Sequence, residues 1–301
     1  MQECVYVHPD NIEHTRRELN LKIAVVARPD AFMQENGCRQ LIVETERGIH
    51  TRCYLAEYQH IPFLIVYGRF ERRRSTSHDI DYALTQEAIS ALGIENVIGT
   101  FVTGSIGEMT KAGSVYIPHD FVGMGGYNQS RNKERGFRNV DMFLPFCGGL
   151  RRCLISAASY SPFLVYPEGI YVSFHGYPRI ETSAELDFYQ QMGWDIVGQT
   201  IDPEATLARE AGCHYASLAV TIDDRELRER FLTNDVTARE EIDVNIGRGR
   251  EKTFSLFLQA LPDIHSMTEP KCNCVQQRLH VGSRSRYFYY RPRYLCTDEE
   301  N

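Results

Sequence analysis

The stretch from Val172 to Asp224 constrains the fold more than any other part of the chain. It contains an apolar run, an acidic segment of helical composition, a second apolar run, a helix start at Asp202-Pro203-Glu204 and a third apolar run from His214 to Thr221. Asp223 and Asp224 follow that last run directly. An open α/β sheet builds small-molecule sites in this way, from polar residues delivered at the ends of its strands. We therefore expect an α/β protein with an enzyme-like pocket.

Length and charge narrow the classes of protein and partner. A chain of 301 residues fits one large domain with a tail. Its 43% hydrophobic and 24% charged residues are globular values, and the formal net charge of −7 disfavours a nucleic-acid partner. The first residues lack a basic segment followed by an apolar core, and no run of about 18 apolar residues occurs. We expect a cytoplasmic protein without a membrane partner.

The nine cysteines are odd in number and scattered, unlike the framework of a small secreted protein. Reduced thiols in a cytosol are the simpler interpretation. Cys272 and Cys274 are separated by one residue, with His265 and His280 further away. Zinc sites usually place two or more residues between paired cysteines. We therefore expect no metal.

The apolar pattern predicts alternating strands and helices in the first part of the chain. A helix is expected over 79–92, because its apolar residues recur at spacings of three and four and Gly93 follows as a natural stop. Strands are expected over 21–27, 51–58, 61–67, 96–101 and 115–121. The second and third of these are expected to form a hairpin across Gln59-His60.

Two helices are expected later in the chain. Asp202 as N-cap and Pro203 at the first helical position predict a helix over 203–211. The capping box Thr237-x-x-Glu240 predicts a long helix that ends near Leu261.

Two segments fit neither pattern. Residues 122–167, rich in glycine and polar residues at their start, indicate a mobile surface loop that serves as a lid or binding element, or a disordered insertion. The last 37 residues mix bases with aromatics, which suits single-stranded nucleic acid, or packing on the body or on a neighbouring subunit. Of these two, we favour a tail that packs on the body or on a neighbouring subunit. We divide the chain into an extension over 1–20, a domain over 21–264 and a tail over 265–301.

Several collinear motifs resemble those of the trimeric purine nucleoside phosphorylase and 5'-methylthioadenosine phosphorylase family. The resemblance runs with gaps from about Leu21 to Ile264 and looks nearest to the methylthioadenosine branch. It is carried by the segments Val97–Ile106, Lys111–Phe121, Gly176–Arg179 with Ala184-Glu185, Gly193–Val197, Pro203-Glu204, Ala208–Gly212 and Tyr215–Ala219. The resemblance implies a three-layer fold with a central twisted mixed β-sheet flanked by helices.

The resemblance also implies a chemistry, pentosyl transfer without a cofactor. Such enzymes break the bond between a purine and C1' of a ribose, with phosphate as nucleophile and co-substrate, through a sugar of oxocarbenium character. Asp223 falls on the residue that contacts the leaving base. Substrate-contacting positions are implied at Gln199, Thr200, Asp224, Ile180, Phe101 and Val102. Phosphate-contacting positions are implied at Arg69, Thr100 and Thr200.

This chain departs from the family pattern around phosphate. Where a glycine-rich loop would cradle the anion, it has Ala27-Arg28-Pro29-Asp30, in which Pro29 has no N–H donor and Asp30 repels an anion. Each lost donor forfeits about 1 to 3 kcal/mol. The chain also differs from the family pattern at five other residues, of which Tyr177 is an insertion. They are Phe70, Phe101, Tyr177, Ile180 and Arg225. The cations that could rebuild an anion site are Arg28, Arg69 and Arg72-Arg73-Arg74.

Three interpretations of function remain open at this point. The first is an enzyme that cleaves a purine nucleoside, one modified at the 5' position among the options, with phosphate or water as acceptor. The second is a catalytically weak or inactive relative, a pseudoenzyme that binds nucleosides or supports an active paralogue. The third is a specialised enzyme that modifies nucleosides in the same pocket. The resemblance implies a homotrimer or a hetero-oligomer with a paralogue.

Overall fold

The structure, a computed structural model, describes residues 5–45, 48, 50–67, 77, 79–107, 110–125, 139–176, 179–267, 272, 274 and 278–279. Its largest feature is a mixed sheet in which the hydrogen-bonded order is β1-β3-β4-β5-β2-β6-β12-β11-β8. β13 pairs with β6 and β7, and β7 pairs with β10. The strands of this sheet are β1 (Val5–Val7), β2 (Ile23–Val26), β3 (Arg39–Glu44), β4 (His50–Tyr58), β5 (Ile61–Val66), β6 (Asn96–Ser105), β7 (Val115–Tyr116), β8 (Asp120–Met124), β10 (Val165–Tyr166), β11 (Ile170–Phe174), β12 (Ile196–Gly198) and β13 (His214–Thr221).

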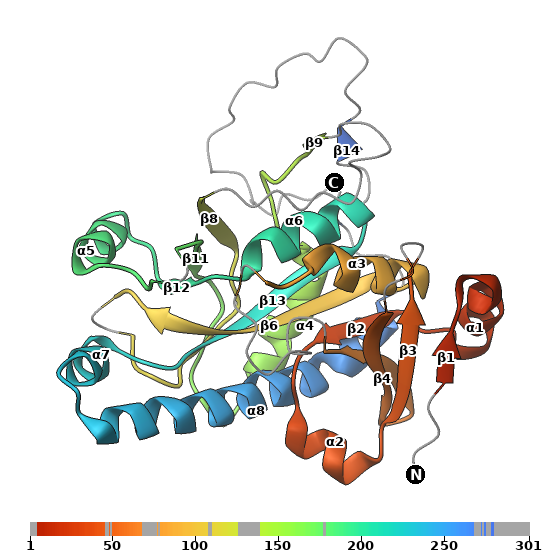
Figure 1. The fold of residues 1–301 in the computed structure, drawn as a ribbon, viewed down its shortest axis with the longest axis horizontal. Helices are drawn as coiled ribbons and strands as arrows, with labels where there is room; N and C mark the ends of the chain where they lie inside the picture. The colour runs from red at the N-terminus through yellow and green to blue at the C-terminus, as the bar shows by residue number, and fades with distance from the viewer. Residues whose placement is uncertain are drawn as a thin grey trace, which may run out of the picture.

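Helices cover both faces of this sheet (Figure 1). Alternate residues of β2 point to opposite faces: Ala24 and Val26 pack in one core with α3 and α6, whereas Ile23 and Val25 pack in the other with α4 and α8. The expected three-layer α/β fold is therefore confirmed. The helices are the 3₁₀ turn η1 (Pro9–Asn11), α1 (Ile12–Leu19), α2 (Asp30–Asn36), α3 (Tyr82–Ala91), α4 (Gly148–Ala158), α5 (Ser183–Gln191), α6 (Ile201–Ala211), α7 (Arg225–Leu232) and α8 (Val236–Ser266).

The hairpin and the first helix form as expected. β4 and β5 pair antiparallel across Gln59 and His60, whose φ angles of 51° and 63° suit the left-handed turn that matches strand twist. Helix α3 is capped by the Asp81 carboxylate, which accepts from the Leu84 amide, and Gly93 follows it with a φ of 72°. Both features come from local turn and cap chemistry.

Two expectations for the middle of the chain are wrong. The single strand over 115–121 is two strands, β7 and β8, because Pro118 between them cannot donate to a ladder. The expected loop over 122–167 contains helix α4, whose Leu150 and Leu154 are fully buried in the core shared with α8. Gly148 and Gly149 open this helix and weaken its sequence signal. Residues 126–138 of that segment lie outside the described ranges.

Helix starts also differ in detail. Asp202 is extended, and its carboxylate accepts from the Thr206 hydroxyl at 2.7 Å rather than from a backbone amide. Helix α8 is capped by Asp235, which accepts from the Thr237 amide, so Thr237 lies inside the helix. The N-cap residue is Thr200 in α6 and Asp235 in α8, in each case two residues before the expected one.

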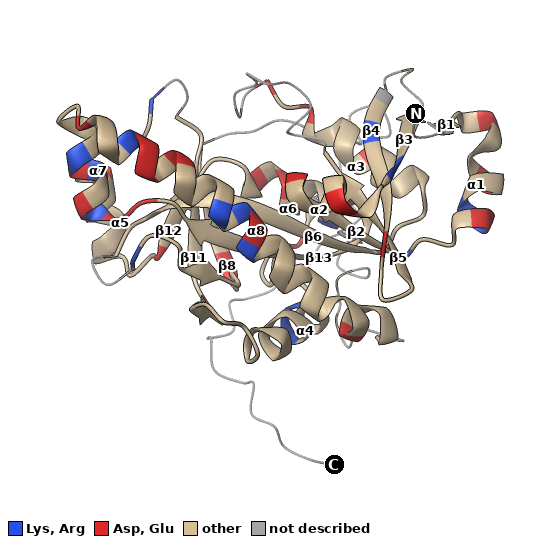
Figure 2. Ribbon diagram, turned by 90° about the horizontal axis from the view of Figure 1, so that it is seen from below, with Lys and Arg blue, Asp and Glu red and all other residues tan. Residues whose placement is uncertain are grey.

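The first and the last described strands pair with other parts of the chain. β1 pairs in parallel with β3, and β14 (Arg278–Leu279) pairs with β9 (Asn139–Val140) in a separate two-stranded sheet. The boundaries expected after residues 20 and 264 stay a prediction. No helix within the described ranges combines the length and the apolar composition needed to span a bilayer. Along α7 and α8, basic and acidic residues are interspersed (Figure 2).

Candidate active site

A cavity of about 410 Å³ opens beside the carboxyl ends of β6 and β13. These strands run parallel with Thr103 opposite Thr221, so the residues that follow them meet at one edge. A cavity of this size fits a small-molecule ligand. Its lining residues are Ser77, Ile80, Thr100, Phe101, Val102, Thr103, Gly104, Ile180, Glu181, Val197, Gly198, Gln199, Thr200, Ile222, Asp223, Arg228, Arg250 and Thr253.

Asp223 is held in this cavity by Arg228, which lies on α7. Arg228 Nη2 donates to Asp223 Oδ1 at 2.7 Å and Nε donates to Oδ2 at 3.2 Å. The Ser105 amide donates to the same Oδ1 at 3.2 Å, and Arg228 Nη2 also donates to the Ser105 carbonyl at 2.8 Å. The two side chains are only 16% and 15% exposed. A bidentate guanidinium therefore fixes the orientation of the carboxylate.

Gln199 and Thr200 enter the cavity from the turn between β12 and α6. The Ser77 hydroxyl donates to Gln199 Oε1 at 2.7 Å, which orients the amide. Thr200 stands at the N-cap position of α6, beside the positive end of that helix. Both residues thus share one cavity with Asp223.

Three further predicted residues lie on β6. The Thr100 hydroxyl donates to the Val26 carbonyl at 2.9 Å, so in this conformation its hydrogen is not directed at a ligand. Phe101 is 4% exposed and meets Tyr171 edge to face with ring centroids 5.8 Å apart. Val102 and Phe101 supply apolar wall to the cavity.

The remaining predicted residues are placed differently. Asp224 does not line the cavity; it caps α7 by accepting from the Leu227 amide at 3.1 Å and lies 3.7 Å from Lys111. Ile180 is 52% exposed at the cavity. Arg69 lies outside the described residues, as do Phe70, Arg72-Arg73-Arg74 and Tyr177.

In the segment that replaces the glycine-rich loop, the charged side chains form hydrogen bonds with one another and with Tyr67. Arg28 Nε lies 2.9 Å and 3.1 Å from the two oxygens of Asp30, and the Tyr67 hydroxyl donates to Asp30 Oδ1 at 2.6 Å. Burial is the largest cause of the raised pKa of Tyr67, followed by its bond to Asp30. Arg28 is not among the cavity-lining residues, so its charge serves this local network.

Sequence reasoning missed several polar cavity residues, among them Glu181, Arg228, Arg250 and Thr253. Burial raises the pKa of Glu181, and the charge of Asp223 raises it further, although a backbone hydrogen bond and Arg228 act in the opposite direction. Arg250 and Thr253 are three residues apart on α8, a spacing that places them on one helix face. That spacing was the only available signal for this pair.

A short network supports the segment that carries Ile180 and Glu181. Arg179 donates to both oxygens of Glu185, at 2.7 and 2.9 Å, and its guanidinium lies 4.6 Å from the centre of the Phe174 ring. Glu185 also accepts from the Thr182 amide in a capping box, and these bonds lower the pKa of Glu185 to about 2. The wall is therefore anchored to the first turn of α5.

Sequence similarity to known proteins covers most of the chain. A family model described as the phosphorylase superfamily matches residues 26–261. A probable 6-oxopurine nucleoside phosphorylase of Thermococcus kodakarensis is 34% identical over 246 residues, which cover 78% of this chain and 88% of that protein. A probable S-methyl-5'-thioinosine phosphorylase of Thermodesulfovibrio yellowstonii is 35% identical over 145 residues, or 48% of this chain and 54% of that protein.

A solved structure shows the same fold. An apo form of a double mutant of the adenosine/methylthioadenosine phosphorylase from Schistosoma mansoni matches with a TM-score of 0.69 at 22% identity, covering 82% of this chain and 92% of that one. At this identity the likeness concerns architecture alone. The family model, by contrast, spans most of this chain, and the Thermococcus relative aligns across most of both sequences. The chain belongs to the phosphorylase superfamily.

Proposed function

We propose that the chain cleaves the N-glycosidic bond of a purine nucleoside, with phosphate as the acceptor. The observation that carries the proposal is that Asp223, Gln199 and Thr200 line one cavity in a member of the phosphorylase superfamily. In the reaction, a phosphate oxygen bonds to C1' as the bond from C1' to the purine nitrogen breaks. The departing base takes up a proton, balanced by the proton that hydrogen phosphate gives up, and the products are a free base and a pentose 1-phosphate.

Asp223 is proposed to bind the base. Its carboxylate is an acceptor held in place by Arg228 and the Ser105 amide. Such an acceptor binds an N–H group of the purine, and the bond strengthens when the leaving base carries that hydrogen. Phe101 and Ile180 supply apolar contact area, and Gln199 and Thr200 supply polar groups toward the sugar.

Arg250 is proposed to bind phosphate together with Thr200. Helix α8 brings this guanidinium to the lining of the same cavity that Thr200 lines at the start of α6. Arginine suits this role because its planar fork binds phosphate oxygens at two points. Arg69, expected from the family pattern, remains a proposed contact, and Thr100 becomes one once its hydroxyl turns from the Val26 carbonyl to the anion.

A second candidate function is favoured by one observation. Arg28, Asp30 and Tyr67 satisfy one another where the family pattern expects a phosphate loop. A chain with this change can bind nucleosides while transferring their pentosyl group to phosphate poorly. Such a chain can act as a supporting subunit beside an active paralogue.

One assay separates these functions. The full chain is incubated with adenosine, inosine, guanosine and 5'-methylthioadenosine, with and without phosphate, and free base and pentose 1-phosphate are separated by chromatography. The proposal expects base release that depends on phosphate. Release without phosphate indicates water as acceptor, binding without release supports the second candidate, and the absence of binding contradicts both.

Assembly and location complete the proposal. We propose a trimer in which a neighbouring subunit covers the cavity beside Ile180, because that cavity residue is 52% exposed in the single chain. Sedimentation equilibrium measures the mass, and a monomer at assay concentration contradicts the assembly. A cytoplasmic location without nucleic-acid or membrane partners stays a prediction, and microscopy of the tagged chain in its own cell tests it.

A further inference from the structure

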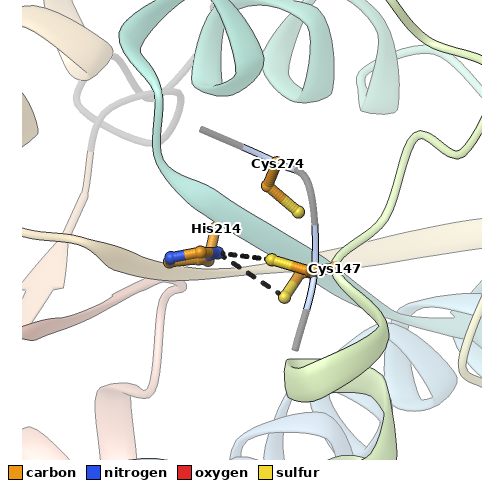
Figure 3. A group of neighbouring side chains, drawn as sticks. Cys147, His214 and Cys274 are labelled. Atoms are coloured by element: carbon orange, nitrogen blue, oxygen red, sulfur yellow. Dashed lines mark hydrogen bonds between the residues drawn. The ribbon is translucent and has the colours of Figure 1, made fainter. Parts of the chain in front are cut away.

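Four side chains with metal-binding atoms meet at a point away from the nucleoside cavity. They are Cys147, His214, Cys272 and Cys274, and their ligand atoms all lie within 4.8 Å of one another. None of them lines the cavity. Figure 3 shows Cys147, His214 and Cys274 converging from separate segments of the chain.

The separations suit a tetrahedral zinc ion. With bonds of about 2.3 Å to sulfur and about 2.0 Å to nitrogen, the edges of such a tetrahedron measure about 3.5 to 3.8 Å. His214 Nδ1 lies 3.7 Å from the Cys147 sulfur and 3.1 Å from the Cys272 sulfur. Shifts of side chains by less than about 1 Å therefore bring all four atoms into coordination.

Two of the ligands are held by a helix and a strand of the fold. Cys147 is the N-cap residue of α4, where the helix dipole favours a thiolate, and its amide donates to the Tyr215 carbonyl at 2.7 Å. His214 begins β13, and its amide donates to the Glu95 carbonyl at 2.8 Å. Cys272 and Cys274 follow α8. The cluster thus joins the sheet, α4 and the segment after the last helix.

Arg209 ties the two halves of the cluster together. This side chain is 2% exposed, and its guanidinium donates to the carbonyls of Leu144, Pro145 and Cys274. Its bonds fix the backbone just before Cys147 and at Cys274 itself. A site of three thiolates and one Zn²⁺ carries a net charge of −1, and Arg209 places a positive charge beside it.

Simple packing explains the cluster less well. A lone buried cysteine behaves as a small apolar residue. Here three sulfurs and an imidazole nitrogen share one space, and Cys147 and Cys274 are 0% and 4% exposed. The described cysteines are free thiols in the structure. Soft sulfur and imidazole donors select zinc over magnesium or calcium.

We propose that these four residues bind one Zn²⁺ in a structural site that anchors the C-terminal segment. Four protein ligands close the coordination sphere, which is the mark of a structural rather than a catalytic zinc. The sequence interpretation expected no metal because it considered Cys272 and Cys274 with His265 and His280. The cluster found in the described residues takes its other ligands, Cys147 and His214, from remote positions.

The test uses the full chain, purified under reducing conditions without chelators. Elemental analysis and native mass spectrometry are expected to find one zinc per chain. Exchange with Co²⁺ is expected to give the visible bands of a tetrahedral ion and a sulfur-to-cobalt charge-transfer band. Cys147→Ser and Cys274→Ser should lose most of the bound metal. Cys153→Ser, which changes a partly buried thiol on the same α4, should retain it.

A measurement on the unmodified chain covers variants that fail to fold. Thiol alkylation followed by peptide mass spectrometry should find Cys147, Cys272 and Cys274 protected with zinc and labelled after chelation. Labelling of Cys153 should not depend on metal. The proposal is overturned if the reduced chain binds zinc far below one equivalent, if Cys153→Ser loses metal equally, or if these three cysteines label alike with and without zinc. A disulfide among them in the metal-loaded chain would also overturn it.

Discussion

Arg228 holds Asp223 through two nitrogen–oxygen contacts of 2.7 and 3.2 Å, and both side chains are less than one fifth exposed. A partly buried pair of this kind stabilises the chain only while both members are present. Arg228 also donates to the Ser105 carbonyl, so the pair links the end of β6 to α7. The same contact that positions the proposed base-binding carboxylate is therefore part of the fold.

A double-mutant cycle tests this linkage. Arg228→Met leaves the Asp223 carboxylate without its partner, and we expect the free energy of unfolding to fall by roughly 2 kcal/mol. Adding Asp223→Asn should recover part of the loss, with a coupling energy of about 1 to 3 kcal/mol. Denaturant unfolding of the four proteins gives these values. Additive effects would mean that the two side chains contribute independently.

Asp223→Asn alone is expected to lower kcat/KM for nucleoside cleavage by at least about 100-fold, because a neutral amide oxygen accepts a hydrogen bond from the leaving base more weakly than a carboxylate does. The fold should remain, as judged by circular dichroism. Asp187→Asn, on the exposed surface of α5, is the matched control and should keep full activity. An unchanged rate in Asp223→Asn removes this residue from the proposed mechanism.

Asp224→Ala separates a cap from a ligand contact. Because Asp224 accepts from the Leu227 amide at the start of α7, its loss should cost about 1 kcal/mol of stability and leave kcat/KM for nucleoside unchanged. Asp224→Ser, which retains a capping oxygen, should restore most of the stability. Thermal unfolding and steady-state kinetics measure the two effects. A large fall in activity in both variants would return Asp224 to the substrate site expected from the family pattern.

Local sequence signals predicted much of the scaffold. The Gln59-His60 turn, the glycine after α3 and the apolar run of β2 each depend on neighbouring residues alone, and each forms as expected. Helix α4 was not predicted, because the glycines and arginines at its start obscure its apolar face. That face is recognisable only from its packing against α8. The family pattern pointed to Asp223, Gln199 and Thr200, which do share a cavity.

Partners that depend on tertiary structure could not be predicted. Arg228 lies five residues after Asp223, and nothing in that spacing says that α7 turns its guanidinium back onto the carboxylate. Cys147 and His214 are 67 positions apart and meet only through the docking of α4 against β13. Such contacts depend on how helices and strands pack in three dimensions, which neighbouring residues alone do not determine.

Glu181→Gln tests the electrostatics of the cavity wall. Burial raises the pKa of Glu181 in the folded chain above its unfolded value of about 4.3. Below that unfolded value both states bind the proton and burial has no ionic cost; as the pH rises through the folded pKa, stability is lost. The glutamine variant should therefore unfold at a higher temperature than the parent near pH 7 and at the same temperature in acid. Glu226→Gln, an exposed change on α7, serves as the control. A variant less stable than the parent near pH 7 contradicts the argument.

Arg250→Met addresses the proposed phosphate contact. Loss of a charge-assisted hydrogen bond forfeits about 1.5 to 3 kcal/mol, so the KM for phosphate should rise by roughly 10- to 100-fold. The KM for nucleoside should change little, because uniform binding is lost for one substrate only. Arg248→Met, exposed two residues earlier on α8, controls for the loss of positive charge and should leave both constants unchanged. Initial rates over a matrix of the two substrate concentrations give these constants. If the KM for phosphate is the same in Arg250→Met and the parent chain, the anion is bound by other groups, and Arg69→Met becomes the variant to measure next.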